Sequence, residues 1–244
     1  MRPVVICLMM VLGAGLLLRG EEIGFAQSFS SSRTDMQSGR RLFRSDDWTA
    51  TKLTCFHCHA DFNEKKNPDN RRIRPGHSLF NSANRSEWQT WDGQVLRSLE
   101  AAIATCAERW LTERDGSKGG NPPEKHHLRQ LVAYLEWEDL SPERKTKALK
   151  PVWAKEIPGD RLLKAGDEGL GMGIYRRACV YCHQEDGSGP GPSLIRNGYS
   201  RHQIARKIRG IDNLGLRGLV MPPFPKDRLS DRQLINVVAY VYMM

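Results

Sequence analysis

The chain has 244 residues, 37 of them Lys or Arg and 28 Asp or Glu, a length that suggests one or two domains. Adding the 22 glycines to the apolar fraction of 39% and leaving out the 6 tyrosines brings that fraction near the roughly 45–50% of globular proteins. This composition excludes a disordered or collagen-like chain. Charges of both signs are spread along the sequence and the only long uncharged apolar run is N-terminal, which excludes a protein with several membrane spans.

The N-terminal segment has the pattern of a secretion signal. Arg2 precedes an uncharged run over residues 3–18, and Gly24 and Ala26 are small residues at the −3 and −1 positions of a cleavage site. The run is shorter than the ~20 residues that cross a bilayer. We therefore interpret residues 1–26 as a signal peptide, and we expect the mature chain to be periplasmic or otherwise exported and not an integral membrane protein. An uncleaved N-terminal anchor is the alternative.

Four of the six cysteines form two close pairs, and a histidine follows each pair, giving CFHCH at 55–59 and CVYCH at 179–183. This spacing is typical of c-type haem attachment, whereas a zinc ribbon places its cysteine pairs much closer together. Both sulfurs can bond the vinyl groups of one porphyrin, and the adjacent histidine then lies under the iron. The sequence predicts two covalently attached haem c groups. Their attachment cysteines and proximal histidines are Cys55, Cys58 and His59, and Cys179, Cys182 and His183.

The two motifs lie in an internal repeat. Gly171, Tyr175 and Cys179 recur every four residues, which predicts a helix that runs into the second attachment motif. Gly39 and Phe43 have the same spacing ahead of the first motif. The sequence therefore predicts two helical units of related design.

A closing helix is expected after each motif, over residues 124–138 and 230–244, because both segments carry the strings RQL and AY and an apolar stripe. Neither half has a convincing alternating strand pattern. The charged segment 141–158 is bounded by proline, and we place a domain boundary near residue 150. The stripes expected to be buried are Leu131, Val132 and Leu135, and Leu234, Val238 and Val241.

Residues 166–244 resemble a class I cytochrome c domain. The string MPPFPKDRLSDRQL at 221–234 resembles the axial-methionine loop and final helix of that family, and GPSL at 191–194 resembles the stretch whose carbonyl accepts a hydrogen bond from the proximal histidine. The resemblance implies that Met221 is the sixth ligand of the second haem. The residues agree, because a thioether is a soft iron ligand and Met221 is the methionine of this half that is best placed in a loop.

The first haem needs a different sixth ligand, because no methionine occurs over residues 37–171. Cys106 is the one mature cysteine outside the two pairs, and it lies in the helical pattern SLEAAIATCAERW. We predict Cys106 as this ligand. His77 and the pair His126 and His127 are alternative ligands, and a buried free cysteine that behaves as a small apolar residue is the structural alternative.

The segment from Cys55 to Glu138 resembles the cysteine-ligated haem domains of the SoxA subunit and of dihaem thiosulfate dehydrogenases. In those families the cysteine is the axial ligand and sulfur chemistry occurs there, and in the dehydrogenases a methionine-ligated domain follows. They tend to place arginines just before the cysteine, where this chain has alanines. Arg109 and Arg74 are the candidate replacements. The features that carry the resemblance are Cys55, Cys58, His59, Gly76, His77, Trp88, Trp91, Ser98, Leu99 and Cys106.

The predicted fold is all-α, with two tandem cytochrome c-like domains over residues 27–150 and 151–244, each wrapped around one covalent haem. A thiolate ligand lowers the iron potential and a methionine raises it, so electrons are expected to pass from the first haem to the second. The electrons would then pass to a redox partner protein. A partner with an acidic surface would suit this chain, because basic residues outnumber acidic ones by 21 to 17 and by 14 to 9 in the two domains.

A second hypothesis is an oxidoreductase that acts on thiosulfate or a related sulfur anion, with Cys106, Arg109 and Arg74 as the catalytic set. Cations that converge on an open face at Cys106 would favour this enzyme. A thiolate sealed under tryptophans would favour the electron carrier. Nucleic acid is not an expected partner, because the chain is exported and its basic residues do not cluster. Whether the chain is an enzyme stays open at this point.

Overall fold

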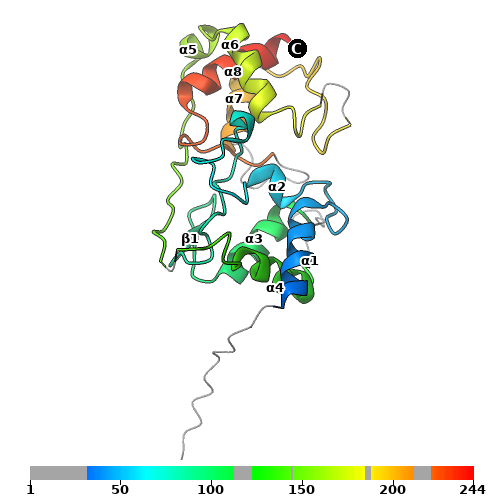
Figure 1. The fold of residues 1–244 in the computed structure, drawn as a ribbon. Helices are drawn as coiled ribbons and strands as arrows, with labels where there is room; N and C mark the ends of the chain where they lie inside the picture. Colours follow the sequence, from blue (N-terminus) through cyan, green and yellow to red (C-terminus); the bar gives the residue numbers. More distant parts are fainter. Residues whose placement is uncertain (1–31, 113–122, 144, 185–187, 212–220) are drawn as a thin grey trace, which may run out of the picture. The chain divides into compact units, whose positions relative to one another are not determined.

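The structure is a computed structural model that describes residues 32–112, 123–143, 145–184, 188–211 and 221–244 (Figure 1). The described residues all belong to one compact unit, Ser31–Met244. The predicted signal peptide over residues 1–26 lies outside the described residues. Among those that are described, no helix is long and apolar enough to cross a bilayer.

Helices account for nearly all regular structure in the part of the chain that the structure describes (Figure 1), which confirms the all-α prediction. The first half contains α1 (Arg33–Arg44), α2 (Cys55–Cys58), the 3-10 helix η1 (Asp69–Arg71), α3 (Leu99–Trp110) and α4 (Lys125–Leu135). The second half contains α5 (Asp160–Lys164), α6 (Glu168–Ala178), α7 (Arg201–Arg209) and α8 (Asp231–Met243).

One small sheet was not expected. Strand β1 (Trp88–Gln89) pairs antiparallel with β2 (Val95–Leu96), with Trp88 opposite Leu96 and Gln89 opposite Val95. Each strand has two residues, which is too short for an alternating pattern to stand out in a sequence.

A glycine allows each pair of long helices to approach closely. A Cβ on Gly39 of α1 would clash with the α4 backbone and lie 2.8 Å from the Cβ of Tyr134. A Cβ on Gly171 of α6 would clash with the α8 backbone and lie 2.8 Å from the Cβ of Tyr240. The same contact is therefore built twice, which confirms the repeat predicted at these glycines.

Each helix pair contributes to its own apolar core. The predicted stripes are buried except Val132, which is partly buried against the first core. The residues that are no more than 3% exposed are Leu131 and Leu135 on α4, and Leu234, Val238 and Val241 on α8. The closing helices therefore turn the predicted faces inward, although α4 ends three residues earlier than expected, at Leu135.

Local signals set the start of α8. The Ser230 hydroxyl accepts a hydrogen bond from the backbone N–H of Gln233, and the Gln233 side chain accepts one from the backbone N–H of Ser230. Such a reciprocal cap satisfies two backbone donors that the helix itself leaves unpaired. Helix α4 begins after Glu124 without a side-chain cap, so its position depends more on packing against α1.

The predicted boundary near residue 150 stays a prediction. Before it, Trp88 forms an isolated backbone bridge with Leu149. After it, Val152 donates its N–H to the Asp227 carboxylate and accepts a hydrogen bond from the backbone N–H of Lys226. Hydrogen bonds therefore hold the segment over residues 149–152 on both sides of the predicted boundary.

An ion pair at the start of α8 gives a stability prediction. The side chain of Arg209 is fully buried, and its Nη2 lies 2.8 Å from Oδ1 of Asp231, whose other oxygen is 2.9 Å from Nζ of Lys226. Burial alone raises the pKa of Asp231, but the hydrogen bonds from Lys226 and Arg209 outweigh it, so the pKa is lowered. The carboxylate therefore adds stability above its unfolded pKa of about 3.9, and this stability is lost as the pH falls through the lower folded value.

We expect Asp231→Asn to lower the free energy of unfolding at neutral pH by about 2 kcal/mol. This is less than the about 3–5 kcal/mol for breaking a fully buried pair, because the Asp231 side chain is 39% exposed. The difference from wild type should shrink below about pH 3, where both proteins lack the charge. Urea unfolding at the two pH values checks this, with Asp160→Asn at the start of α5 as the control. A pH-independent difference would contradict it.

Candidate haem sites

The first attachment motif forms a single helical turn. Thr54 caps α2 by accepting a hydrogen bond from the backbone N–H of His57, and Nδ1 of His57 accepts one from the Thr54 backbone, 2.9 Å away. The middle histidine of the motif is thus bound to its own helix end, and it does not line the cavity described below. His59 follows in extended conformation as the C-cap.

Both predicted proximal histidines are held in the same way. Nδ1 of His59 lies 2.7 Å from the backbone oxygen of His77, and Nδ1 of His183 lies 2.8 Å from that of Pro192. A carbonyl only accepts, so Nδ1 carries the proton in each ring and Nε2 keeps its lone pair for a metal. The acceptor in the second half lies in the stretch that the cytochrome c resemblance implies, and the first half repeats it with His77.

A glycine makes each of these hydrogen bonds possible. The N–H of Gly76 donates to the carbonyl of Cys58 at 2.9 Å, and that of Gly191 donates to the carbonyl of Cys182 at 2.8 Å. A Cβ on Gly76 would clash with the ring of His59, and one on Gly191 would lie 2.8 Å from the ring of the second proximal histidine. Backbone and imidazole can therefore meet only where a side chain is absent.

Burial keeps the predicted proximal histidines and the motif cysteines uncharged. It lowers the pKa of His59 to about 4, and it also lowers the pKa of His183 against the opposing hydrogen bond to Pro192. Both imidazoles are then in the ligand-competent form at neutral pH. Burial likewise raises the pKa of all four motif cysteines. Sulfurs in such surroundings are costly as thiolates and suit neutral thioethers, so the residues fit covalent haem.

A largely apolar cavity opens beside the first motif. It encloses about 1410 Å³ of empty space, part of it open to solvent. Its largely apolar lining fits a flat macrocycle. The wall includes Cys55, Cys58 and His59, Cys106 and Ile103 of α3, Leu131 and Leu135 of α4, the tryptophans Trp48, Trp88, Trp91, Trp110 and Trp153, and Pro222 and Pro223.

The cavity brings Cys106 together with the first motif. The Ser98 hydroxyl accepts a hydrogen bond from the backbone N–H of Ala101 and so caps α3, which carries Cys106 into the wall. Cys106 packs in one apolar cluster with Cys55 and Trp91. Burial raises the pKa of Cys106 to about 11, so the protein alone does not ionise this thiol. A bound metal would, because a coordinating thiol is deprotonated.

The alternative ligands are committed elsewhere. His77 lines the cavity, but its Nε2 lies 2.6 Å from Oδ2 of Asp227, and its carbonyl holds the proximal ring. The rings of His126 and His127 lie outside the lining; His127 packs against Trp48 with 5.5 Å between ring centres.

The two arginines of the enzyme hypothesis do not line the cavity. The guanidinium carbon of Arg109 lies 5.2 Å from the ring centre of Trp110. The fully buried side chain of Arg74 pairs with Asp69 at 2.7 Å and donates to the carbonyl of Phe56. Neither of these arginines therefore supplies a cation to the lining. The arginine that does line the cavity is Arg85, whose Nη2 donates a hydrogen bond to the carbonyl of Ser78 at 3.0 Å.

Asp61 is a buried carboxylate that sequence reasoning missed. Its side chain is 3% exposed, takes a hydrogen bond from the Tyr134 hydroxyl at 2.6 Å, and pairs with Arg44 at 2.7 Å. It lies two residues after His59 and ties that segment to α1 and α4. Its position just behind the motif was the available signal, but no local pattern marks a carboxylate that will be buried.

Met221 is half-buried at the start of the last described segment and packs against the second core, which includes Cys179. Residues 212–220, which precede it, lie outside the described residues. The Tyr175 hydroxyl donates a hydrogen bond to the carbonyl of His183, so α6 also supports the second proximal histidine. These contacts place Met221 and the second motif against the same core.

Comparison with known proteins agrees with the second site. Residues 167–241 match the family model described as cytochrome c oxidase, cbb3-type, subunit III. No match was found among curated protein sequences. Thiosulfate dehydrogenase (TsdBA) from Marichromatium purpuratum, in its as-isolated form, is similar in structure with a TM-score of 0.45 and 18% identity. The similarity covers 85% of this chain and 45% of that chain, so this chain spans less than half of that protein's length.

The matched region contains the CVYCH motif and the supported histidine. Residues 167–241 are therefore similar to a cytochrome c domain, a class of domain that binds haem covalently and transfers electrons.

Proposed function

We propose that this chain is an exported dihaem cytochrome that takes up electrons at its first half and passes them through its second half to a redox partner. In this proposal Cys55 and Cys58 attach one haem and Cys179 and Cys182 attach the other. The axial ligands are His59 and Cys106 in the first half, and His183 and Met221 in the second.

The duplicated histidine support is the observation that carries the proposal. In both halves a glycine N–H donates to the carbonyl of the second motif cysteine, and the next residue's carbonyl accepts from Nδ1 of the histidine. Since residues 167–241 match a cytochrome c family model, the same arrangement around CFHCH supports a haem in the first half. The cavity beside CFHCH has a largely apolar lining that suits it.

The distal residues set the direction of transfer. A bound haem supplies reversible one-electron oxidation and reduction. The anionic sulfur of Cys106 would stabilise the oxidised form at the first site, and the neutral sulfur of Met221 the reduced form at the second. Electrons would therefore collect in the second half.

The lining of the cavity favours a carrier over a sulfur-anion oxidoreductase. A site that binds thiosulfate needs cations or hydrogen-bond donors aimed at the anion. Arg74 and Arg109 do not line the cavity, and Arg85, which does, donates a hydrogen bond to the carbonyl of Ser78. Cys106 packs in an apolar cluster with Trp91 and Trp110, which suits electron relay.

Two measurements on the exported protein test the proposal. Its mass should exceed that of the polypeptide by two haems, and a redox titration should show two one-electron steps separated by on the order of 100 mV or more, because axial ligands span about 0.8 V. Thiosulfate alone should leave the visible spectrum of the oxidised protein unchanged. A single haem, or rapid reduction by micromolar thiosulfate, would overturn the proposal.

A further inference from the structure

Exposed apolar side chains gather where α8 ends and the chain approaches α7. Ile195 is 48% exposed, Tyr199 41%, Tyr242 44% and Met243 61%. Several large apolar side chains close together are unusual on a surface that faces only water. We call residues 195–207 together with 240–244 the α7–α8 surface.

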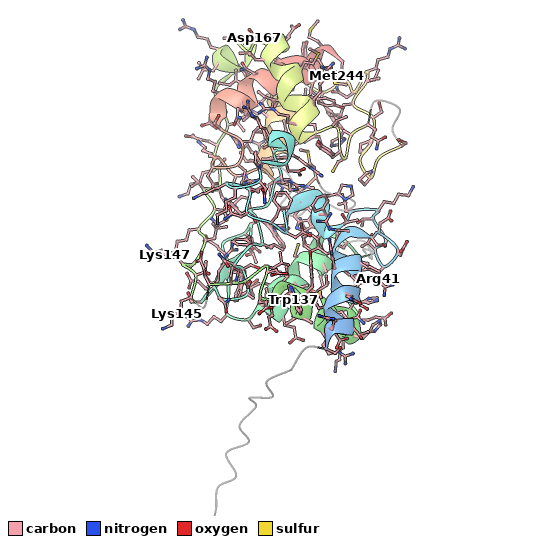
Figure 2. The ribbon with its side chains drawn as sticks, in the orientation of Figure 1. Arg41, Trp137, Lys145, Lys147, Asp167 and Met244 are labelled. Atoms are coloured by element: carbon pink, nitrogen blue, oxygen red, sulfur yellow. The ribbon has the colours of Figure 1, made fainter. Side chains whose placement is uncertain are left out.

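Contacts across this surface show that its two segments are adjacent. The N–H of Arg196 donates to the carbonyl of Met244, which is labelled at the end of α8 in Figure 2, at 3.1 Å. The guanidinium carbon of Arg201 lies 3.8 Å from the ring centre of Tyr242, and Nζ of Lys207 lies 4.8 Å from that of Tyr199. Each of the two tyrosines therefore has a cation against its ring, and the two segments lie next to each other.

The charged side chains here are all basic. Residues 194–210 and 232–244 contain no Asp or Glu. Arg196 is exposed, and Arg201 and Lys207 are partly exposed over their tyrosine partners. An apolar centre with a rim of one charge is the arrangement of a transient protein interface, in which the rim steers a partner of opposite charge.

The surface is also close in the chain to the second proximal histidine. The carbonyl of Pro192 accepts the hydrogen bond from His183, and the surface begins three residues later, at Ile195. A protein docked on Ile195 would be connected to that histidine by one hydrogen bond and the backbone of residues 192–195.

We infer that the α7–α8 surface is the docking site for an acidic electron-transfer protein and the exit for electrons from the second half. The inference rests on the proposed function and adds the surface and the chemistry of the partner. One electron leaves the reduced cytochrome and reduces the oxidised metal centre of the acceptor.

A charge reversal tests the rim. The acceptor is a small acidic blue-copper protein, whose Cu(II) is reduced to Cu(I), mixed with reduced cytochrome in a stopped-flow instrument at about 10 mM ionic strength, where screening is weak. The triple variant Arg196→Glu, Arg201→Glu, Lys207→Glu should lower the second-order rate constant about 100-fold, within the range of electrostatic steering. A control that changes the net charge equally, Arg33→Glu, Arg40→Glu, Arg41→Glu on exposed α1 positions, should lower it less than about 5-fold.

A second variant tests the apolar centre without a change in charge. Tyr199→Ser with Tyr242→Ser should lower the rate constant about 10-fold even at high salt, because loss of aromatic contact is not screened. Both variants should keep the haem content and redox potentials of the wild type, which separates a failure of docking from a failure of the proposed function.

Three outcomes would overturn the inference. In the first, the triple variant lowers the second-order rate constant no more than the α1 control does. In the second, the wild type reacts faster with a basic acceptor of similar potential than with the acidic one. The third is binding of wild type to vesicles of anionic phospholipid that the triple variant loses while its rate with the copper protein is unchanged, which would assign the surface to a membrane.

Discussion

Replacing Cys106 with alanine is expected to remove a thiolate–iron charge-transfer band from the spectrum of the oxidised protein. It should also raise the lower of the two redox potentials by on the order of 100 mV or more, because an anionic sulfur stabilises ferric iron. Cys106 is the residue of α3 that lines the cavity with a sulfur, and it packs with Cys55. Ultraviolet–visible spectroscopy and a redox titration measure both effects.

Two histidine variants are the controls for this experiment. The double variant His126→Ala, His127→Ala removes rings that lie outside the cavity lining, so its spectrum should match the wild type. His77→Ala removes a side chain paired with Asp227 but keeps the carbonyl that holds His59, so the charge-transfer band should remain. An oxidised low-spin spectrum that lacks the charge-transfer band, is unchanged in Cys106→Ala and is lost in His77→Ala would assign the ligand to His77.

The second large effect is expected at the glycines behind the proximal histidines. A methyl group on Gly76 would clash with the ring of His59 and lie 2.8 Å from the carbonyl of Cys58. The imidazole must then rotate or the backbone must move, and either change breaks the hydrogen bond to His77. We expect Gly76→Ala to keep its covalent haem but to lose the proximal ligand, with a high-spin spectrum and a melting temperature lower by roughly 10 °C, from a cost of about 2–3 kcal/mol.

Alanine variants at two further glycines serve as comparisons for Gly76→Ala. Gly191→Ala should perturb the second haem less, because its nearest contact with the histidine ring is 2.8 Å. Gly173 lies on an exposed part of α6 with nothing within 4 Å of an added Cβ, so Gly173→Ala should stabilise the protein by up to about 1 kcal/mol through helix propensity. Equal spectra for Gly76→Ala and Gly173→Ala would contradict the proposed role of the close contact.

The sequence predicted the elements that depend on residues close together along the chain. The helix that leads into CVYCH and the final helix were predicted because their residues recur with helical spacing. The glycine pair Gly39 and Gly171 also stood out as a repeat. The β1–β2 hairpin was missed, since two-residue strands depend on neighbouring segments for their stability.

The candidate site shows the same division. The spacing of the cysteines and histidines by itself predicted the attachment motifs, because thioether bonding to one porphyrin requires residues that are close along the chain. Which residues surround Cys106 was decided only by the tertiary structure. Arg74 was a candidate cation there, but folding buries it against Asp69 and Phe56. His77 was a candidate distal ligand, but folding uses its carbonyl for His59 and its ring for Asp227. Such contacts join residues far apart in the chain, whose meeting depends on how the packed elements bury their apolar faces, and no local spacing encodes it.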